Sequence, residues 1–482
     1  MYLNDKLLIG KNPNYEANLI PKMANRHGII SGASGSGKTI TLKVLAESFS
    51  SSGVPVFLVD VKGDLAGMCK PGIKENIEKR LNNLEIENFN CESFPTVFWD
   101  VFGTSGHPIR TTITKIGPKI LAKMLNLSDA QEGVLTIAFK IAANEQLELI
   151  DLKDLRTMLT HIGDKRKDYT LEYGNINTQS IGSIQRSILT LQEEGGDYFF
   201  GKPDFELKDF IHFDGHNGYG NINILDAQIL FQKPTLYACF LLWLLQTTYN
   251  TMPEVGDLNK PKLVFFFDEA HLLFDEITDR LCKEIIQIVK LIRSKGIGLY
   301  FISQNPSDIP DEILSQLGNR IQHTLRSYTP AEEKSIKSAA KSYRQNPTFN
   351  AEEEIKKLAT GEALVSFQNE NGEPEIVEKV TILPPQSMMG PISDELRQSI
   401  IKSSYVYNKY ETLIDENSAH EKILVQKEQE RKNEEQTKAT TPISKGRPKK
   451  SNLEKAATKV SNSAMNTIGR SIGKAIIKGL FK

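Results

Sequence analysis

Eight consecutive residues near the start of the chain match the Gly-x-x-x-x-Gly-Lys-[Ser/Thr] pattern of a phosphate-binding loop. They are Gly32, Ala33, Ser34, Gly35, Ser36, Gly37, Lys38 and Thr39. The small residues allow backbone N–H groups to surround a phosphate, and a helix that starts here adds unpaired N–H donors. Lys38 can reach the β- and γ-phosphates, and the Thr39 hydroxyl can ligate Mg²⁺. The pattern therefore predicts a binding site for ATP and Mg²⁺.

Two adjacent carboxylates follow an apolar run at residues 263–267. In the second half of such a site, Asp268 would hold Mg²⁺ through its water shell. Glu269 would polarise the attacking water as a general base. For the nearby His271, a packing or hydrogen-bonding role is favoured over a catalytic one.

Polar and cationic residues flank the next apolar run, at residues 299–303. Gln304 can contact both the γ-phosphate and the lytic water, or it can simply end the strand before Pro306. Arg293 can stabilise a transferring phosphoryl group, although the end of a helix also attracts cations. Arg320 and Arg326 are candidates for a second cationic sensor, with salt bridges as the alternative.

Short apolar runs that alternate with amphipathic helical stretches are typical of a parallel sheet covered by helices. The predicted fold is an α/β P-loop NTPase with a mainly parallel, RecA/ASCE-like sheet flanked by helices, a helical insertion and a flexible basic C-terminal tail. The candidate strands are residues 28–31, 55–60, 96–100, 221–226, 262–268, 299–303 and 320–325.

Changes in periodicity and composition divide the chain. Apolar residues at helical spacing indicate a helical insertion, and an Asn371-Gly372 turn predicts a hairpin of residues 363–367 and 376–383. The predicted parts are the first part of an ATPase core (1–110), the helical insertion (111–195), the second part of the core with the hairpin (196–385), a charged helical extension (386–438), and a basic disordered linker with a terminal amphipathic helix (439–482).

The composition favours a globular protein, because 39% of the 482 residues are hydrophobic and 25% are charged. Four separate cysteines without a Cys-x-x-Cys pair argue against a disulfide framework or a zinc site. The beginning of the chain lacks the apolar stretch of a signal peptide, and the longest apolar run, residues 236–245, is too short to span a bilayer. We therefore expect a cytoplasmic protein with no transmembrane segment.

Positive charge is concentrated in the last forty residues. Residues 443–482 contain ten Lys or Arg and one acid, a charge of +9, whereas the whole chain carries −1, so the other 442 residues carry −10. Such an arm can bind DNA, or it can be a solvated tail. It contains the Gly-Arg-Pro core of an AT-hook at residues 446–448 and a basic amphipathic stretch at residues 468–482.

The ordered motifs resemble those of the HerA/FtsK group of motor ATPases, and most closely the YjgR-type branch of HerA-like helicase-domain proteins. The resemblance covers nearly the whole chain and fails mainly between about residues 415 and 460. The motifs that carry it are residues 32–39, 59–65 (Val-Asp-Val-Lys-Gly-Asp-Leu), 266–271, 293–299, 303–307, 316–323, 360–367 and 468–473.

This resemblance implies a ring, usually a hexamer, with each ATP between two subunits. Arg293 would then be an arginine finger that acts on the neighbour's nucleotide, and Gln304 a sensor. The resemblance also implies that the Asp268 strand lies beside the P-loop strand. HerA proteins carry an N-terminal β-barrel that docks a nuclease, but here the P-loop begins at Gly32. A nuclease partner is therefore doubtful, and the helical insertion is a candidate for subunit contacts.

These observations predict an ATP-hydrolysing, HerA-like DNA translocase or helicase that works as a ring oligomer. Two other functions remain open. One is an ATP-gated scaffold that binds DNA or protein with little turnover, and the other is a polypeptide-translocating ATPase. DNA affinity that falls as salt rises would favour the first prediction over a polypeptide motor.

Overall fold

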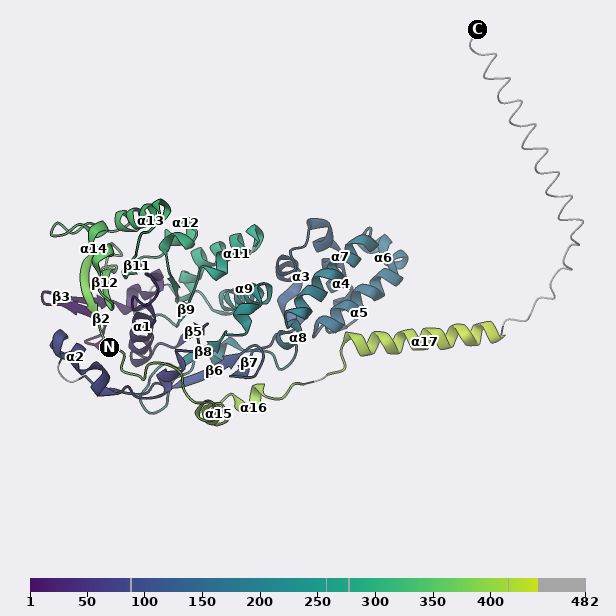
Figure 1. Ribbon diagram of the computed structural model, residues 1–482. Helices are drawn as coiled ribbons and strands as arrows, with labels where there is room; N and C mark the ends of the chain where they lie inside the picture. The colour runs from purple at the N-terminus through teal and green to yellow at the C-terminus, as the bar shows by residue number, and fades with distance from the viewer. Residues whose placement is uncertain (87–88, 257, 276–277, 415, 441–482) are drawn as a thin grey trace, which may run out of the picture. The chain divides into compact units, whose positions relative to one another are not determined.

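The computed structural model describes residues 1–86, 89–256, 258–275, 278–414 and 416–440 (Figure 1). Within these residues, thirteen strands form one sheet. They are β1 (Tyr2–Leu3), β2 (Lys6–Asn12), β3 (Tyr15–Leu19), β4 (Gly28–Ser31), β5 (Val56–Asp60), β6 (Thr96–Asp100), β7 (His107–Pro108), β8 (Ile222–Asp226), β9 (Leu263–Phe267), β10 (Ile297–Ser303), β11 (Asn319–Gln322), β12 (Glu362–Ser366) and β13 (Glu378–Ile382).

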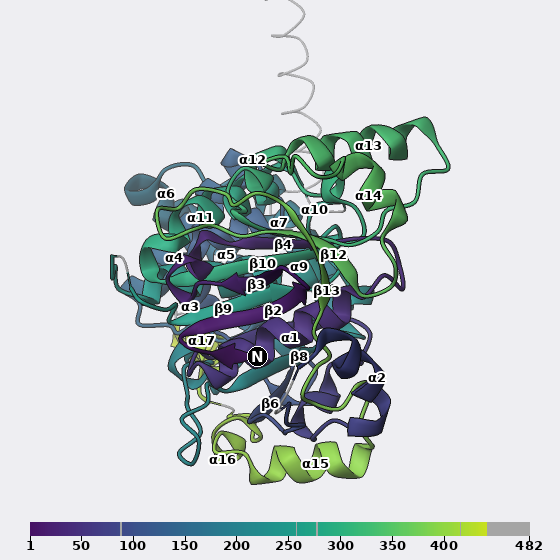
Figure 2. The same cartoon turned by 90° about the vertical axis from the view of Figure 1, so that its left-hand side faces the viewer.

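The sheet has a parallel part and an antiparallel part. The strand order is β1-β2-β13-β12-β11-β4-β10-β9-β5-β8-β6-β7, and β3 pairs with β2. Every pair from β11 to β7 is parallel, whereas the pairs from β11 to β1 are antiparallel. The predicted α/β fold with a mainly parallel sheet is confirmed. Figure 2 shows β4, β10, β9, β8 and β6 in this order down the sheet.

One expectation about this order is wrong. The strand that ends before Asp268, β9, does not lie beside the P-loop strand, β4, because β10 lies between them. Ser303 of β10 pairs with Ser31, and Phe301 of the same strand pairs with Phe267. β9 and β10 are consecutive strands joined by a helix, and such units place their two strands side by side. Gln304, which follows β10, is therefore inserted between the P-loop and Glu269.

Helices cover both faces of the sheet (Figures 1 and 2). The helices among the described residues are α1 (Lys38–Ser51), α2 (Lys74–Leu84), α3 (Ile113–Met124), α4 (Asp129–Asn144), α5 (Leu152–Asp164), α6 (Arg166–Tyr173), α7 (Thr178–Glu193), α8 (Gly196–Phe199), α9 (Pro234–Thr251), α10 (Leu272–Asp275), α11 (Asp279–Leu291), α12 (Asp311–Leu314), α13 (Pro330–Lys341), α14 (Ala351–Lys357), α15 (Asp394–Ser403), α16 (Tyr407–Tyr410) and α17 (Ala419–Thr440). No helix in the described ranges is long and apolar enough to cross a bilayer.

Side chains of the central strands alternate between two hydrophobic cores, as the two-residue period of a strand requires. Phe265 and Phe267 of β9 join a core with α9 and α11. Val264 and Phe266 join the core on the other face, which contains residues of α1 and β2. β9 is buried along its whole length, so the carboxylates that follow it start from a fixed position.

The predicted helical insertion is present as α3 to α7, and it shares a core with the sheet. Ile116 of α3 and Ile184 and Ile188 of α7 belong to the same cluster of buried residues as Phe265. α3 begins where the Thr112 hydroxyl accepts a hydrogen bond from the Lys115 N–H group. The insertion is therefore packed as part of the ATPase core, even though its sequence interrupts the alternation of strands and helices.

The part of the chain after β11 completes the sheet and adds further helices. β12 and β13 pair in antiparallel register, as the Asn371-Gly372 turn predicts. The first compact unit extends to Ile423, and the second begins at Leu424 in α17. The predicted charged helical extension, residues 386–438, contains α15, α16 and most of α17. The basic arm lies outside the described residues.

Candidate active site

The predicted P-loop follows β4 and leads directly into α1. Gly37 has a φ of 116°, and a Cβ there would lie 3.2 Å from the Cα of Gly361. A Cβ at Gly32, where φ is 155°, would lie 2.5 Å from the Cβ of His323. Both positions combine a backbone conformation that favours glycine with a close neighbour. The tertiary packing of the loop therefore requires glycine at the places where the motif has it.

His323, directly after β11, holds the P-loop from the side. Its ring is fully buried, with Nδ1 2.9 Å from the carbonyl oxygen of Glu362 and Nε2 2.8 Å from the Thr41 hydroxyl. Because a carbonyl only accepts, Nδ1 carries the proton and Nε2 accepts from Thr41. Burial lowers the pKa of His323 to about 4. The sequence alone gave no role to His323, and the motif at residues 316–323 was the only sequence feature that could have indicated one.

Lys38 and Ser36 give the loop the donors that a phosphate needs. The Lys38 ammonium is buried and donates to the carbonyl oxygens of Gly32 at 2.6 Å and Ala33 at 3.2 Å. The buried Ser36 hydroxyl has no hydrogen-bond partner among the described residues. α1 begins at Lys38, so the N–H groups of its first turn lack intrahelical acceptors. These donors converge on one loop and fit a polyphosphate.

Asp268 and Glu269 follow β9 at the same edge of the sheet. Asp268 is 4% exposed, and its Oδ1 accepts from the N–H group of Glu269 at 2.9 Å. Burial, with the neighbouring charge of Glu269, raises the pKa of Asp268 to about 7. Glu269 has a φ of 47°, in the left-handed region that a residue with a side chain seldom adopts. Strain of this kind persists where surrounding contacts impose it, often at functional sites.

The Glu269 carboxylate is in contact with side chains from three segments. Its Oε1 accepts from the Lys62 ammonium at 2.5 Å, and its Oε2 accepts from the Gln304 amide at 3.4 Å. The Nδ1 of His271 lies 3.5 Å from the same Oε2. Burial alone would raise the pKa of Glu269, but the hydrogen bond and charge of Lys62 outweigh burial and leave the pKa lowered. Lys62 is a site residue that the sequence analysis did not assign.

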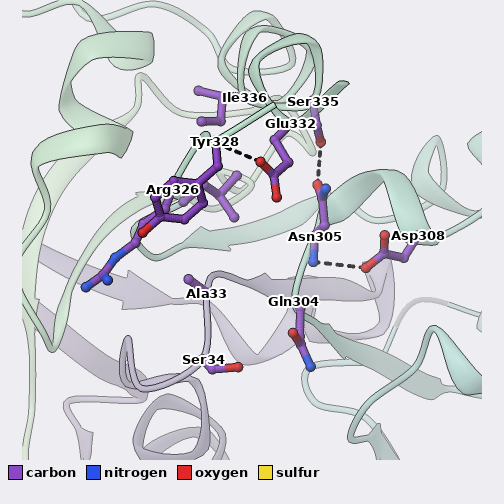
Figure 3. Close-up of a pocket in the computed structure, with 11 residues that line it drawn as sticks. Ala33, Ser34, Gln304, Asn305, Asp308, Arg326, Tyr328, Glu332, Ser335 and Ile336 are labelled. Atoms are coloured by element: carbon purple, nitrogen blue, oxygen red, sulfur yellow. Dashed lines mark hydrogen bonds between the residues drawn. The ribbon is translucent and has the colours of Figure 1, made fainter. Parts of the chain in front are cut away.

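A cavity of about 470 Å³ opens beside the P-loop (Figure 3). Ala33 and Ser34 form one wall, and Gln304 and Asn305 form another. The Asn305 amide oxygen accepts from the hydroxyl of Ser335 on α13, so the segment after β10 is tied to that helix. Asn305, the chain neighbour of Gln304, thus connects the end of β10 to α13.

Arg293 is not brought to the P-loop of its own chain. It lies in a 3₁₀ turn, Ile292–Lys295, before β10, whereas Gln304 follows the same strand. Seven strand residues span roughly 20 Å. The charge of Arg293 instead acts on His27, which precedes β4. Arg293 and the P-loop therefore lie at opposite ends of neighbouring parallel strands.

The other two candidate arginines have different surroundings. The Arg320 guanidinium donates to the carbonyl oxygens of Leu317 and Leu314, both at 3.1 Å. Arg326 lines the cavity with Ala33 and Ser34, and Figure 3 shows its guanidinium pointing away from Gln304. Of these two, only Arg326 is placed beside the P-loop.

The oxygen ligands predicted for a metal ion are sparse. Asp268 and the Thr39 hydroxyl are hard oxygen donors of the kind that Mg²⁺ prefers. Among the described residues, no group of three or more His, Cys, Asp or Glu side chains could hold a metal ion. Asp268 and Thr39 are the residues that would hold a Mg²⁺ bound together with a nucleotide.

A family model described as "Helicase HerA-like C-terminal" matches residues 5–482. The chain belongs to this family. The predicted resemblance to the HerA group is therefore confirmed. Among the HerA relatives, the DNA double-strand break repair helicase HerA of Sulfolobus acidocaldarius is 23% identical over 74% of this chain and 65% of its own length. The protein of the same name from Saccharolobus solfataricus is 24% identical over 74% of this chain and 64% of its own length. The chain thus spans slightly less than two thirds of these helicases.

Solved structures share the fold of this HerA-like chain. The conjugative coupling protein TrwBdeltaN70, in a trigonal form with sulphate, has a TM-score of 0.52 and 13% identity over 81% of this chain and 92% of its own. VirB4 of Thermoanaerobacter pseudethanolicus has a TM-score of 0.50 and 15% identity over 83% of this chain and 99% of its own. Both likenesses agree with the predicted α/β fold.

Proposed function

We propose that this HerA-like chain hydrolyses ATP and uses the reaction to move DNA through a ring of subunits. One observation carries the proposal: the Lys38 loop, Gln304 and Glu269 follow three neighbouring parallel strands, β4, β10 and β9. In an open parallel sheet, ligands bind outside the carboxyl ends of the strands. Phosphate donors and a buried carboxylate thus lie at the edge where a nucleotide is held.

Each residue has a proposed role. The P-loop holds the phosphates of ATP, and Lys38 leaves its loop carbonyls to reach the β- and γ-phosphates. Thr39 and Asp268 hold Mg²⁺, which when bound neutralises phosphate charge. Glu269 orients and deprotonates the attacking water, since its carboxylate is ionised under the influence of Lys62. Gln304 contacts Glu269 and reports the state of the γ-phosphate to α13 through Asn305.

The DNA and ring parts of the proposal rest on similarity and charge. The similar proteins from Sulfolobus acidocaldarius and Saccharolobus solfataricus are named DNA double-strand break repair helicases. We propose that residues 443–482, with a charge of +9, contact DNA. We propose that Arg293 acts on a neighbouring subunit's nucleotide, in a ring that we expect to be a hexamer. We also propose a cytoplasmic location.

The direct test is the rate of phosphate release with single-stranded DNA, duplex DNA and no polymer, on material of known assembly mass. We expect the natural chain to hydrolyse Mg-ATP and DNA to stimulate it, while Lys38→Ala lowers the rate by about two orders of magnitude or more through lost phosphate contacts. The chain truncated before Ile443 should bind DNA with a smaller dependence on salt.

The outcomes separate the open functions. Nucleotide binding without phosphate release would indicate an ATP-gated scaffold. Hydrolysis without DNA affinity would indicate a motor for polypeptides. Unchanged hydrolysis by Lys38→Ala would contradict the P-loop assignment itself.

A further inference from the structure

Lys62 lies at the candidate site but has no assigned step in the reaction. Lys62 follows β5, and Glu269 follows β9. Because β5 and β9 pair in parallel register, both residues come from the same edge of the sheet. The side chain of Lys62 is 51% exposed, whereas that of Glu269 is 7% exposed. An ammonium group thus reaches from the solvent side onto the buried carboxylate of the proposed general base.

This contact engages one oxygen of the proposed general base. A general base must accept a hydrogen bond from the water that it deprotonates. Oε1 of Glu269 accepts from Lys62 at 2.5 Å, and Oε2 accepts from Gln304 at 3.4 Å with His271 at 3.5 Å. Each carboxylate oxygen can accept two hydrogen bonds, so Lys62 takes one of the two acceptor positions of Oε1 and holds this oxygen toward the solvent side. A water that approaches Oε1 must share it with Lys62.

The backbone around Lys62 is held in place by a turn. The Asp60 carboxylate accepts from the N–H groups of Gly63 at 2.7 Å and Leu65 at 3.0 Å. Gly63 has a φ of 78°, and a Cβ there would lie 2.6 Å from the amide nitrogen of Gln228. The turn that carries Lys62 is thus held by two hydrogen bonds to the Asp60 carboxylate.

We propose that Lys62 is a positioning residue that restrains Glu269, so that Glu269 aligns with the attacking water more readily when their ion pair opens. The inference rests on the proposed ATPase function. A half-exposed ion pair is weak because water competes for both partners. The restraint therefore slows hydrolysis by a small factor rather than blocking it.

The test compares steady-state phosphate release by the natural chain, Lys62→Met and Lys62→Arg. Lys62→Met keeps the length of the side chain and removes its charge, so kcat without polymer should rise about two- to fivefold, the factor expected for losing one half-exposed ion pair. KM for Mg-ATP should stay within about twofold of the natural value, because the substitution does not change how tightly the nucleotide is bound before the reaction. Lys62→Arg keeps the charge and should keep the slow rate.

Lys115→Met is the matched control. Lys115 is 56% exposed and pairs with the partly buried Asp204 at 2.8 Å, away from the site. Its substitution removes a comparable ion pair and should leave kcat unchanged. Thermal unfolding of each variant shows whether a change in kcat accompanies a loss of stability.

Several results would overturn the inference. A kcat for Lys62→Met that is equal to or below that of the natural chain would show that Lys62 does not restrain Glu269. A raised KM with constant kcat would make Lys62 a nucleotide contact instead. A natural chain that binds Mg-ATP but releases no phosphate would defeat the proposed function, and this inference with it. If only the role of Lys62 is wrong, the natural chain still binds Mg-ATP and releases phosphate.

Discussion

At the scale of single residues, Glu269 is constrained in both backbone and side chain. Its φ of 47° sets the direction in which the side chain leaves the end of β9. Asp268, one residue earlier, is nearly buried and has a raised pKa, whereas the pKa of Glu269 is lowered. Two adjacent carboxylates with pKa values shifted in opposite directions suit two different tasks. Glu269 is the one that stays ionised.

Replacing Glu269 by Gln removes the base and keeps the size of the side chain. We expect Glu269→Gln to retain binding of Mg-ATP and to lower kcat by about two to four orders of magnitude, the usual contribution of a general base. Nucleotide binding by fluorescence and phosphate release in the same preparation measure both effects. Glu284→Gln, which breaks the ion pair with Lys123 outside the site, is the control. Loss of nucleotide binding in Glu269→Gln would indicate a structural role.

At the scale of elements, β11 and β12 support the P-loop from outside the motif. His323 after β11 bridges Thr41 of α1 and the start of β12 at Glu362. The N–H group of Gly361 donates to the carbonyl oxygen of Ser36 within the loop. The phosphate-binding loop is thus held by segments nearly three hundred residues away in the sequence.

The buried His323 predicts a pH dependence of stability. Its pKa of about 4 in the folded chain lies below the value of about 6.5 for an unfolded one, so folding favours the neutral ring. This contribution is present above pH 6.5 and is lost as the pH falls toward 4. Between pH 7 and pH 5 the loss amounts to about 2 kcal/mol. Between these two pH values, the free energy of unfolding measured in urea should change by about 2 kcal/mol less in His323→Gln than in the natural chain.

His27 provides a control for this experiment. Burial lowers its pKa to about 4 as well, and its ring contacts Val289 and Leu299 at the opposite end of the strands from the P-loop. His27→Gln should flatten the same pH dependence without affecting nucleotide binding, whereas His323→Gln should also weaken binding of Mg-ATP. Equal nucleotide affinities in the two variants would contradict a role of His323 in supporting the P-loop.

At the scale of the whole molecule, Arg293 and the proposed site of the same chain lie at opposite ends of β10. The strand β10 separates Arg293 from Gln304, which contacts Glu269. A side chain cannot cover the roughly 20 Å length of that strand. If Arg293 takes part in hydrolysis, it acts on a neighbouring subunit in a head-to-tail ring.

Mixing two inactive variants tests this arrangement. Subunits with Arg293→Ala keep Glu269, and subunits with Glu269→Gln keep Arg293. In a randomly mixed ring, about one quarter of the interfaces combine an intact Glu269 with a neighbour's intact Arg293, so activity should recover to about that fraction of the natural rate. Mixing Arg293→Ala with a chain that carries both substitutions should give no recovery. No recovery in the first mixture, with exchange of subunits verified, would contradict an action in trans.

Individual strands show what could be predicted from the sequence and what could not. The seven predicted strands are all present, with ends shifted by three residues or fewer. The strands β1 to β3 were not predicted. In β2, Leu7, Leu8 and Ile9 are all buried, and a bulge between Leu8 and Gly10 disturbs the alternation that reveals a strand. Neither propensity nor periodicity identifies a strand whose burial pattern comes from its neighbours.

The sequence by itself determined the features that depend on chemistry between near neighbours in the chain. The P-loop, the carboxylates Asp268 and Glu269, and the alternation of strands and helices need only residue type and spacing, because backbone geometry positions such neighbours locally. The tertiary structure decided the rest: the insertion of β10 between β4 and β9, the support by His323 and the contact of Lys62 with Glu269. These depend on which strands pair and which side chains meet across the sheet, and the whole hydrophobic core sets that pairing.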